Sequence, residues 1–288
     1  MTTNADGVSV PKQYCAFGSD QTLLERALER ARGVTPPGQL VTVVAQQHRE
    51  HWAPLRSGPD GENVVVQPRN RGTAPGLLLP LLHIALRAPE ATVAVFPSDH
   101  YVRDEDVLQR ALDQALDLAD ELRGRIVLLG VEPEAATPDY GYIVPDEDAL
   151  GGSHGVACFV EKPERTRARA LVRGGALWSS FMFTGRVDAF LGLFRETQPH
   201  LLSTMLAAVE PSGVHGPEVS ALYEQLESRD LSRDVFAASI HRLRAACVPA
   251  CGWSDLGTPA RLRSALPRLR GELRGAPAYT SSLMERSA

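Results

Sequence analysis

The stretch TVAVFPSDHYV, residues 92–102, decides the fold that we expect for this chain. Residues 93–97 form a short apolar run with β-branched side chains, which predicts a buried central strand. Asp99 follows directly at the carboxyl end of that run. Ligands of open parallel sheets lie beyond the carboxyl ends of the strands, so we expect Asp99 to hold a divalent metal ion against a phosphate. The alternative role, capping of the next helix, suits Asp104 better because it stands just before that helix.

Apolar runs and helical periodicities alternate on both sides of this strand. The runs predict strands at residues 40–45, 64–67 and 126–131, and the periodicities predict helices at 22–32, 77–86 and 104–122. Strands that alternate with helices indicate a mainly parallel sheet with helices on both faces. The fold class that we predict is therefore α/β.

The pattern changes after residue 131. Shorter strands are predicted at 140–144, 155–161 and 177–184, as in an insertion that builds half of a cleft. Helices are predicted at 187–197, 218–228 and 259–269, with a strand-like segment at 246–248 and a loose polar tail after residue 271. No linker is long enough to separate two large domains.

Composition excludes several classes of function. The 288 residues are 43% hydrophobic, and 35 acidic against 30 basic residues give a net charge of −5, which argues against a nucleic-acid partner. The longest apolar run, residues 77–86, is too short to span a membrane. The four cysteines show neither a zinc spacing nor a disulfide framework. We expect a cytoplasmic protein with small-molecule substrates, and a homo-oligomer is possible.

Lysine is almost absent from the chain. Of the 30 basic residues, 28 are arginine and only Lys12 and Lys162 are lysine. A lysine ammonium is a compact charge that can approach a phosphate without the planar fork of arginine. We therefore favour phosphate-binding roles for both over the alternative of two ordinary surface lysines.

Several catalytic or nucleotide-binding motifs can be excluded, either because they are absent or because the residues around them do not fit. The GGSHG of residues 151–155 spells a nucleophile elbow, but a polar turn precedes it and a strand follows, which predicts a hairpin loop. No dinucleotide-binding or P-loop glycine motif is present. Residues 104–106 and 146–148 spell D-x-D, as in metal-dependent glycosyltransferases, but we interpret them as a helix start and a solvated turn.

Three other segments carry residues that suit one common binding site. Gln67 and Gly72, in the segment QPRNRGTAP, offer hydrogen-bonding groups and close backbone approach to a planar base, although the segment could be a plain turn. The pair Glu161 and Lys162 could meet a sugar hydroxyl and a phosphate, or form a surface ion pair. Asp255 supplies a second carboxylate, and two carboxylates on one cation are common in Mg²⁺ sites.

Six segments together resemble a known family. QPRNRGTAP, VFPSDH, YGYI, FVEKP, LWSSFMF and GWSDLG occur in the order found in nucleotide-sugar pyrophosphorylases of the mannose-1-phosphate guanylyltransferase type, over about residues 11–257. The resemblance implies a Rossmann-like, GT-A-like nucleotidyltransferase fold with a mixed, mainly parallel sheet. It also implies that residues 1–260 form the nucleotidyltransferase domain and residues 261–288 a C-terminal helix and tail. The implied reaction converts GTP and mannose 1-phosphate to GDP-mannose and pyrophosphate.

The resemblance also implies a role for each matching residue. Asp99 and Asp255 would bind Mg²⁺, Lys12 would face the nucleotide phosphates, and Lys162 would hold the sugar phosphate. The sugar would be contacted by Gly141, Glu161 and Ser179. The base would be contacted by Gln67, Gly72 and Thr73. The sugar phosphate would attack the α-phosphorus in line, without a covalent enzyme intermediate.

The chain departs from the family pattern in three places. Ser179 stands where relatives often have asparagine, and an acidic residue expected after Ser232 and Asp234 is replaced near Ser239. Residues 1–10 contain no counterpart of the family's first strand and glycine-rich loop. We therefore expect the chain to be truncated relative to the working protein. Three alternatives stay open: another sugar-1-phosphate nucleotidyltransferase, a non-catalytic nucleotide-sugar-binding relative, and a D-x-D glycosyltransferase.

Overall fold

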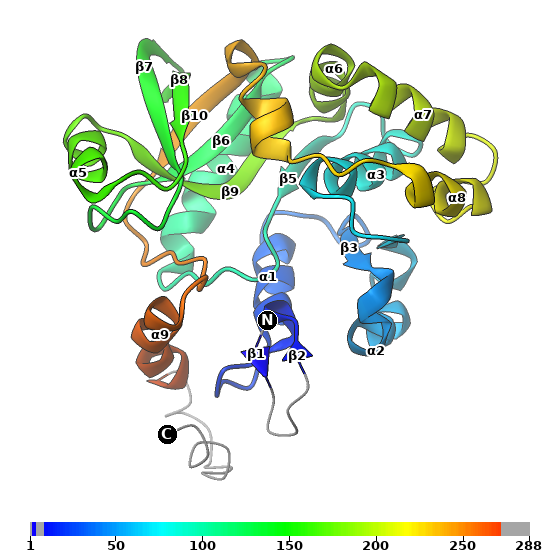
Figure 1. Ribbon diagram of the computed structural model, residues 1–288, viewed down its shortest axis with the longest axis horizontal. Coiled ribbons are helices and arrows are strands. Elements are labelled where there is room, and N and C mark those ends of the chain that lie inside the picture. The colour runs from blue at the N-terminus through cyan, green and yellow to red at the C-terminus, as the bar shows by residue number, and fades with distance from the viewer. Residues whose placement is uncertain (1, 4–8, 272–288) are drawn as a thin grey trace.

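The computed structural model describes residues 2–3 and 9–271, and it places most strands in one mixed sheet (Figure 1). The order of the six strands in this sheet is β5 (Thr92–Val95), β9 (Leu177–Arg186), β6 (Ile126–Val131), β10 (Leu243–Val248), β8 (Ser153–Val160) and β7 (Tyr142–Leu150). Two further pairs lie apart from it: β3 (Thr42–Ala45) with β4 (Val64–Gln67), and β1 (Thr2–Thr3) with β2 (Ser9–Val10).

The directions of the strands confirm a mixed sheet. Strand β9 is antiparallel to β5, β6 and β7, and β8 is antiparallel to β7 and β10. Four of the six strands therefore run in one direction, as the prediction of a mainly parallel sheet requires. Because β9 lies between β5 and β6, however, β6 and β10 are the only neighbours in this sheet that pair in parallel. Strands β3 and β4 also pair in parallel.

Helices cover both faces of the sheet. Successive side chains of β6 point to opposite faces: Val127 and Leu129 pack in a cluster with α4, and Ile126 and Leu128 pack in a cluster with α3, α6 and α7. The helices are α1 (Leu23–Arg32), α2 (Arg49–Trp52), α3 (Thr73–Ala85), α4 (Glu105–Glu121), α5 (Arg165–Arg173), α6 (Val187–Thr197), α7 (Pro199–Val209), α8 (Pro217–Gln225) and α9 (Pro259–Gly271). None of the described helices is both long and apolar enough to cross a membrane.

The predicted elements are present, with several corrections to their extent. Helix α1 begins with the predicted capping box between Thr22 and Glu25, and GGSHG lies at the β7–β8 hairpin. Helix α3 begins four residues before the predicted start, and β7 and β10 are longer than predicted. Helices α2, α5 and α7 were not predicted. The tail at residues 272–288 lies outside the described residues.

Two acidic segments agree with the prediction in part. Residues 104–106 begin α4 as predicted, but the side chain of Asp104, at the N-cap position, makes no capping hydrogen bond and pairs with Arg103. Residues 146–148 are exposed as predicted, but they belong to β7, in a part of the strand where the register with β8 shifts. Asp148 accepts a hydrogen bond from the buried Arg244 guanidinium, which supplies the acidic partner that a buried cation requires.

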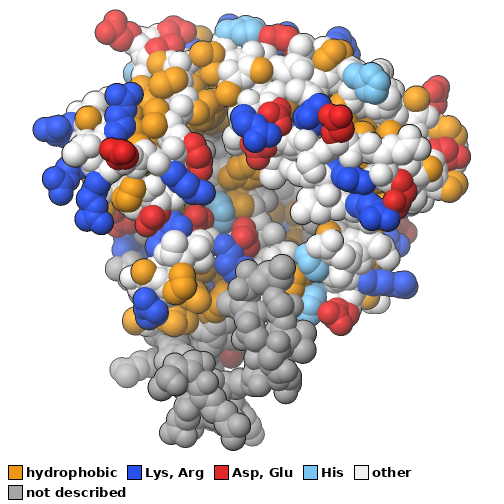
Figure 2. Space-filling model, viewed as in Figure 1, with side chains coloured by type: hydrophobic (Ala, Val, Ile, Leu, Met, Phe, Trp, Pro, Cys, Tyr) orange, Lys and Arg blue, Asp and Glu red, His pale blue; other side chains and the backbone are white. Residues whose placement is uncertain are grey.

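The strand predicted to be central is an edge strand. β5 pairs with β9 alone among the described strands, and its residues are only partly buried. All six residues of β6, which pairs on both sides, are buried. The described part of the chain leaves an opening between β5 and β3, and the face drawn in Figure 2 is hollowed near its centre.

Candidate active site

Lys12 contacts two segments that lie far apart from each other in the sequence. Lys12 belongs to a short 3₁₀ turn, Asp99 follows β5, and Asp255 follows β10. The Lys12 Nζ atom lies 2.9 Å from Asp99 Oδ2 and donates a hydrogen bond to the backbone carbonyl of Asp255. The structure therefore brings together Lys12, Asp99 and Asp255, as the sequence predicted.

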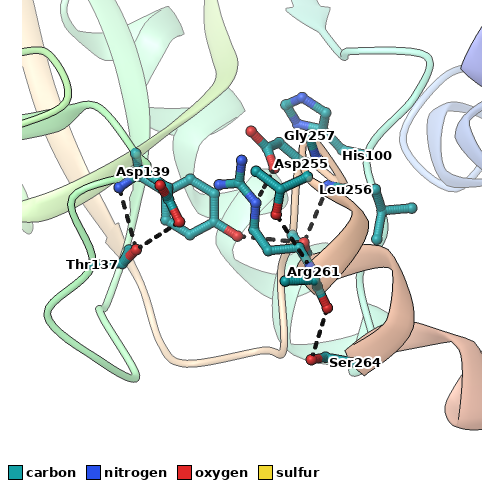
Figure 3. Close-up of polar contacts among 12 residues, drawn as sticks. His100, Thr137, Asp139, Asp255, Leu256, Gly257, Arg261 and Ser264 are labelled. Atoms are coloured by element: carbon teal, nitrogen blue, oxygen red, sulfur yellow. Dashed lines mark hydrogen bonds and ion pairs between the residues drawn. The ribbon is translucent and has the colours of Figure 1, made fainter.

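The Asp255 carboxylate is contacted by one residue just before α9 and by one residue within α9. Its Oδ1 atom accepts a hydrogen bond from the Gly257 backbone N–H at 2.8 Å and lies 3.2 Å from Arg261 Nε (Figure 3). The next residue, Leu256, has a φ of 48°, a left-handed conformation that is uncommon for a leucine. These contacts fix Oδ1 and leave the second carboxylate oxygen as the atom that can meet a ligand.

Aromatic side chains pack behind this carboxylate. Tyr140 contacts both Trp178 and Trp253, with ring centroids 4.8 and 4.9 Å apart, and the Arg261 guanidinium lies 4.4 Å from the centroid of the Tyr140 ring. Such rings are rigid and attract a cation to their faces. The cluster therefore holds Arg261 in place between Tyr140 and Asp255.

His100 lies next to Asp99 and is neutral at pH 7. Burial lowers its pKa to about 4, even though the neighbouring carboxylates raise it. The ring packs edge-on against Trp253, with centroids 5.3 Å apart. His100 therefore adds no positive charge beside Asp99, and the ammonium of Lys12 is the cation in contact with that carboxylate.

The four residues expected at the sugar also come together. The Ser179 N–H donates to the Gly141 carbonyl at 2.8 Å, and a Cβ at Gly141 would lie 2.6 Å from Glu161 Oε2. A side chain at position 141 would therefore displace the Glu161 carboxylate from its present position. Lys162 is largely exposed, lies 3.6 Å from Glu161 and has a φ of 42°, a strained conformation of a kind that often occurs at functional sites.

The three residues expected at the base lie on the rim of a large cavity. Its volume is about 1130 Å³, and Gln67, Gly72, Thr73 and Asp99 are among the residues that line it. The Gln67 Nε2 atom is buried and has no hydrogen-bond partner within the described residues, so it is a donor that a ligand could use.

Gly72 and Thr73 each have a structural role as well. Gly72 has a φ of 86°, and a Cβ there would lie 2.3 Å from the Arg229 carbonyl. The Thr73 hydroxyl accepts a hydrogen bond from the Leu231 N–H at 2.8 Å. Close approach of residues 229–231 therefore accounts for both residue types without a base. The Gln67 side chain also has neighbours within the protein, since it lies beside Tyr223 and against Gly76 of α3.

Sequence reasoning missed Arg261 and the aromatic cluster. Nothing in the sequence of α9 separates Arg261 from the other arginines near it. The aromatic residues carried a signal that could have been used, because Tyr140, Trp178 and Trp253 each stand in or beside one of the segments YGYI, LWSSFMF and GWSDLG.

The carboxylates fit a hard divalent cation. Asp99 and Asp255 have side chains that are 35% and 28% exposed, so both can reach a ligand. The described residues contain no group of three or more His, Cys, Asp or Glu side chains that could enclose a metal by themselves. A site of two carboxylates completed by water and substrate phosphates suits Mg²⁺, which retains waters and binds few protein ligands.

Comparisons with known proteins identify relatives of this chain. The chain is 32% identical to the alginate biosynthesis protein AlgA of Pseudomonas putida over 86% of this chain and 52% of that protein. It is 31% identical to the mannose-1-phosphate guanylyltransferase of Escherichia coli, over 87% of this chain and 54% of that protein. The chain therefore spans about half the length of the curated relatives it matches.

A solved structure with a similar fold comes from Thermus thermophilus and is described as a mannose-1-phosphate geranyltransferase. The match has a TM-score of 0.72 and 27% sequence identity, and it covers 82% of this chain and 67% of that one. The nucleotidyl transferase family matches residues 8–271, which include every candidate site residue. This chain belongs to the nucleotidyl transferase family.

Proposed function

We propose that this chain transfers a guanylyl group from GTP to mannose 1-phosphate and releases pyrophosphate. The observation that carries the proposal is the convergence of Lys12, Asp99 and Asp255 from three distant segments at one point. Relatives named as mannose-1-phosphate guanylyltransferases support the choice of substrates.

Two clusters would hold the two substrates. Gln67, with its unpartnered buried amide, would contact the base on one side of Asp99. On the other side, Glu161 would accept hydrogen bonds from the sugar hydroxyls, and the exposed ammonium of Lys162 would meet the sugar phosphate. The reaction needs the two phosphates side by side, and binding them in one geometry removes much of the entropic barrier.

Charge neutralisation would supply most of the remaining catalysis. A bound Mg²⁺ would offset negative charge on the phosphates, and Asp99 and Asp255 would hold it. Lys12, now paired with Asp99, would also face the nucleotide phosphates and stabilise the charge that develops on the leaving pyrophosphate. Catalysis by positioning and electrostatics needs no nucleophilic side chain.

The test is pyrophosphate release from a panel of substrate pairs in the presence of Mg²⁺. GTP, ATP, UTP, CTP and dTTP are each combined with mannose 1-phosphate and with glucose 1-phosphate. We expect the fastest release from GTP with mannose 1-phosphate. A different preferred pair would assign the chain to another sugar-nucleotide synthesis, and absence of release from every pair would overturn the proposed activity.

A further inference from the structure

Helix α5 carries four exposed arginines within nine residues. They are Arg165, Arg167, Arg169 and Arg173. None of the four forms an ion pair with an acidic residue within residues 2–3 and 9–271. Arginines on other helices have such partners, as Arg30 of α1 has in Glu105. The positive charge of α5 can therefore act on a group from outside the chain.

The neighbouring residues do not neutralise this charge. Residues 161–173 contain five basic against two acidic residues, which gives the segment a net charge of +3 in a chain whose net charge is −5. One of the two acids, Glu161, already lies 3.6 Å from the Lys162 ammonium. Figure 2 shows basic side chains gathered over α5, at the left of the view. The charge of this segment is thus opposite in sign to that of the chain as a whole.

Three of the arginines form a stripe that begins beside the candidate active site. Arg165, Arg169 and Arg173 are each four residues apart, so they share one flank of the helix. The stripe is about 12 Å long at 1.5 Å per residue. Its first arginine stands three residues after Lys162, which we place at the sugar phosphate. The stripe therefore leads to an ammonium that is placed to bind a phosphate.

Exposed charges of this kind attract an anion over a distance more than they stabilise a contact. A single exposed ion pair contributes little, because water and salt screen it. The summed field of several like charges raises the local concentration of an oppositely charged substrate, and it extends over about 30 Å at 0.01 M salt. The whole stripe lies within that range of Lys162, since three residues span at most about 11 Å and the helix adds about 12 Å.

The composition of α5 favours a small anion over a polyanionic surface. The helix contains no aromatic side chain. It therefore lacks the groups with which proteins stack on nucleic-acid bases or anchor in a lipid interface. A phosphate monoester needs neither group, and it is close to a dianion at pH 7 because its second pKa is about 6.

We propose that the stripe formed by Arg165, Arg169 and Arg173 is a steering surface that draws a phosphorylated sugar to Lys162. The arginines raise the local concentration of the anion, and the Lys162 ammonium then binds its phosphate. The identification of the anion as a sugar phosphate rests on the proposed function. The attraction of a phosphate dianion towards Lys162 does not rest on it, and this attraction can be measured separately.

Covalent labelling of Lys162 tests the attraction without any measurement of turnover. Pyridoxal 5′-phosphate and pyridoxal carry the same aldehyde, which forms an imine with a lysine amine, but only the first carries a phosphate. The chain has only two lysines, so borohydride reduction and peptide mass spectrometry distinguish the label at Lys162 from that at Lys12. The measured quantity is the ratio of the labelling rates of the two reagents at Lys162. A change in the reactivity of the amine itself cancels in this ratio.

The test variant replaces the three arginines of the stripe by glutamine, which has a similar helix propensity. We expect the ratio to fall at least about threefold at about 0.01 M salt, and the difference from the unmodified chain to disappear at about 1 M salt, where the Debye length is about 3 Å. The control variant removes the same charge from exposed positions outside α5. It carries R123Q, R125Q and R195Q, and it should leave the ratio unchanged.

Turnover provides a second and separate measurement. With the substrate pair that the chain uses, the test variant should raise the KM for the sugar phosphate at least about threefold at low salt and leave kcat unchanged, because attraction at a distance does not alter the chemical step. An unchanged labelling ratio in the test variant, or an equal fall in the control variant, would overturn the steering proposal whatever the activity of the chain. A lowered ratio without any turnover would support steering and would overturn the proposed function alone.

Discussion

The two halves of the candidate site differ in how completely the protein surrounds them. On the six-stranded sheet, Gly141 lies directly against Glu161, and Tyr140 packs between two tryptophans and Arg261. On the side of β3, β4 and α3, Gln67 lies at a 1130 Å³ cavity with a buried amide that has no partner within the described residues. The first half is organised by contacts within the protein, and the second half has room for additional groups.

Strands β5 and β6 show what produces this difference. Both carry apolar, partly β-branched sequences, yet every residue of β6 is buried and every residue of β5 is only partly buried. Among the strands that the structure describes, β6 has neighbours on both sides, and β5 has one. Burial is thus set by the neighbouring strands as much as by hydrophobicity.

The largest effect, a loss of pyrophosphate release, is expected at Asp99, where the two halves of the candidate site meet. Asp99→Asn removes a carboxylate charge that the proposed mechanism needs, so pyrophosphate release should fall by at least about 100-fold with the fold intact. Asp106→Asn, at an exposed position on α4, is the control and should leave release unchanged. Release within threefold of the unmodified chain would remove Asp99 from the mechanism.

Matched valine substitutions compare the two strands directly. Val127→Ala in β6 creates a cavity in a fully buried site and should lower the free energy of unfolding by about 2–3 kcal/mol. Val93→Ala in β5 should cost about 1 kcal/mol or less, because part of that side chain already contacts solvent. Urea denaturation measures both. Equal losses would show that the partial exposure of β5 has no energetic consequence.

The role of α9 is tested at Arg261, which contacts the Asp255 carboxylate. Arg261→Gln removes the ion pair and the contact with Tyr140, so we expect about a tenfold weaker response to Mg²⁺. Mn²⁺ binding followed by electron paramagnetic resonance provides a readout besides turnover. Arg263→Gln, at an exposed position of the same helix, is the control. An unchanged metal affinity in Arg261→Gln would exclude this positioning role.

The smallest effect, a change in the pH dependence of stability, is expected at His83. This residue belongs to α3 and lines the cavity. Burial, with a smaller contribution from the nearby Arg87, lowers the pKa of His83 to about 4. The unfolded chain therefore binds a proton more readily than the folded chain between about pH 6.5 and pH 4. Stability should fall as the pH is lowered through this window, and His83→Gln should reduce the slope. An identical pH dependence in the variant would show that His83 is not the group responsible.

Much of the fold could be predicted from local patterns. The capping box at Thr22, the alternation of strands with helices, and the turn at GGSHG each depend on neighbouring residues, and each appears in the structure. The position of β5 at an edge depends on which strands lie beside it, and no local pattern carries that information. The contact between Asp148 and Arg244, 96 residues apart in the sequence, likewise depends on tertiary packing and has no local signal.

The candidate site was predicted in part. Lys12, Asp99 and Asp255 come together as expected, and the motif context of each residue was sufficient to find it. Gly72 and Thr73 lie where expected, but contacts with residues 229–231 explain them without a base. Arg261 was missed because its partners, Tyr140 and Asp255, are identified only by the packing of α9.

The most direct test of the central claim is to identify which bond the chain breaks and which bond it makes. Phosphorus-31 NMR of a mixture of the chain, Mg²⁺, GTP and mannose 1-phosphate resolves all the products. Our account predicts GDP-mannose and pyrophosphate in equal amounts, because the α-phosphorus is attacked in line. Formation of GDP with free phosphate, or unchanged GTP and mannose 1-phosphate, would contradict it.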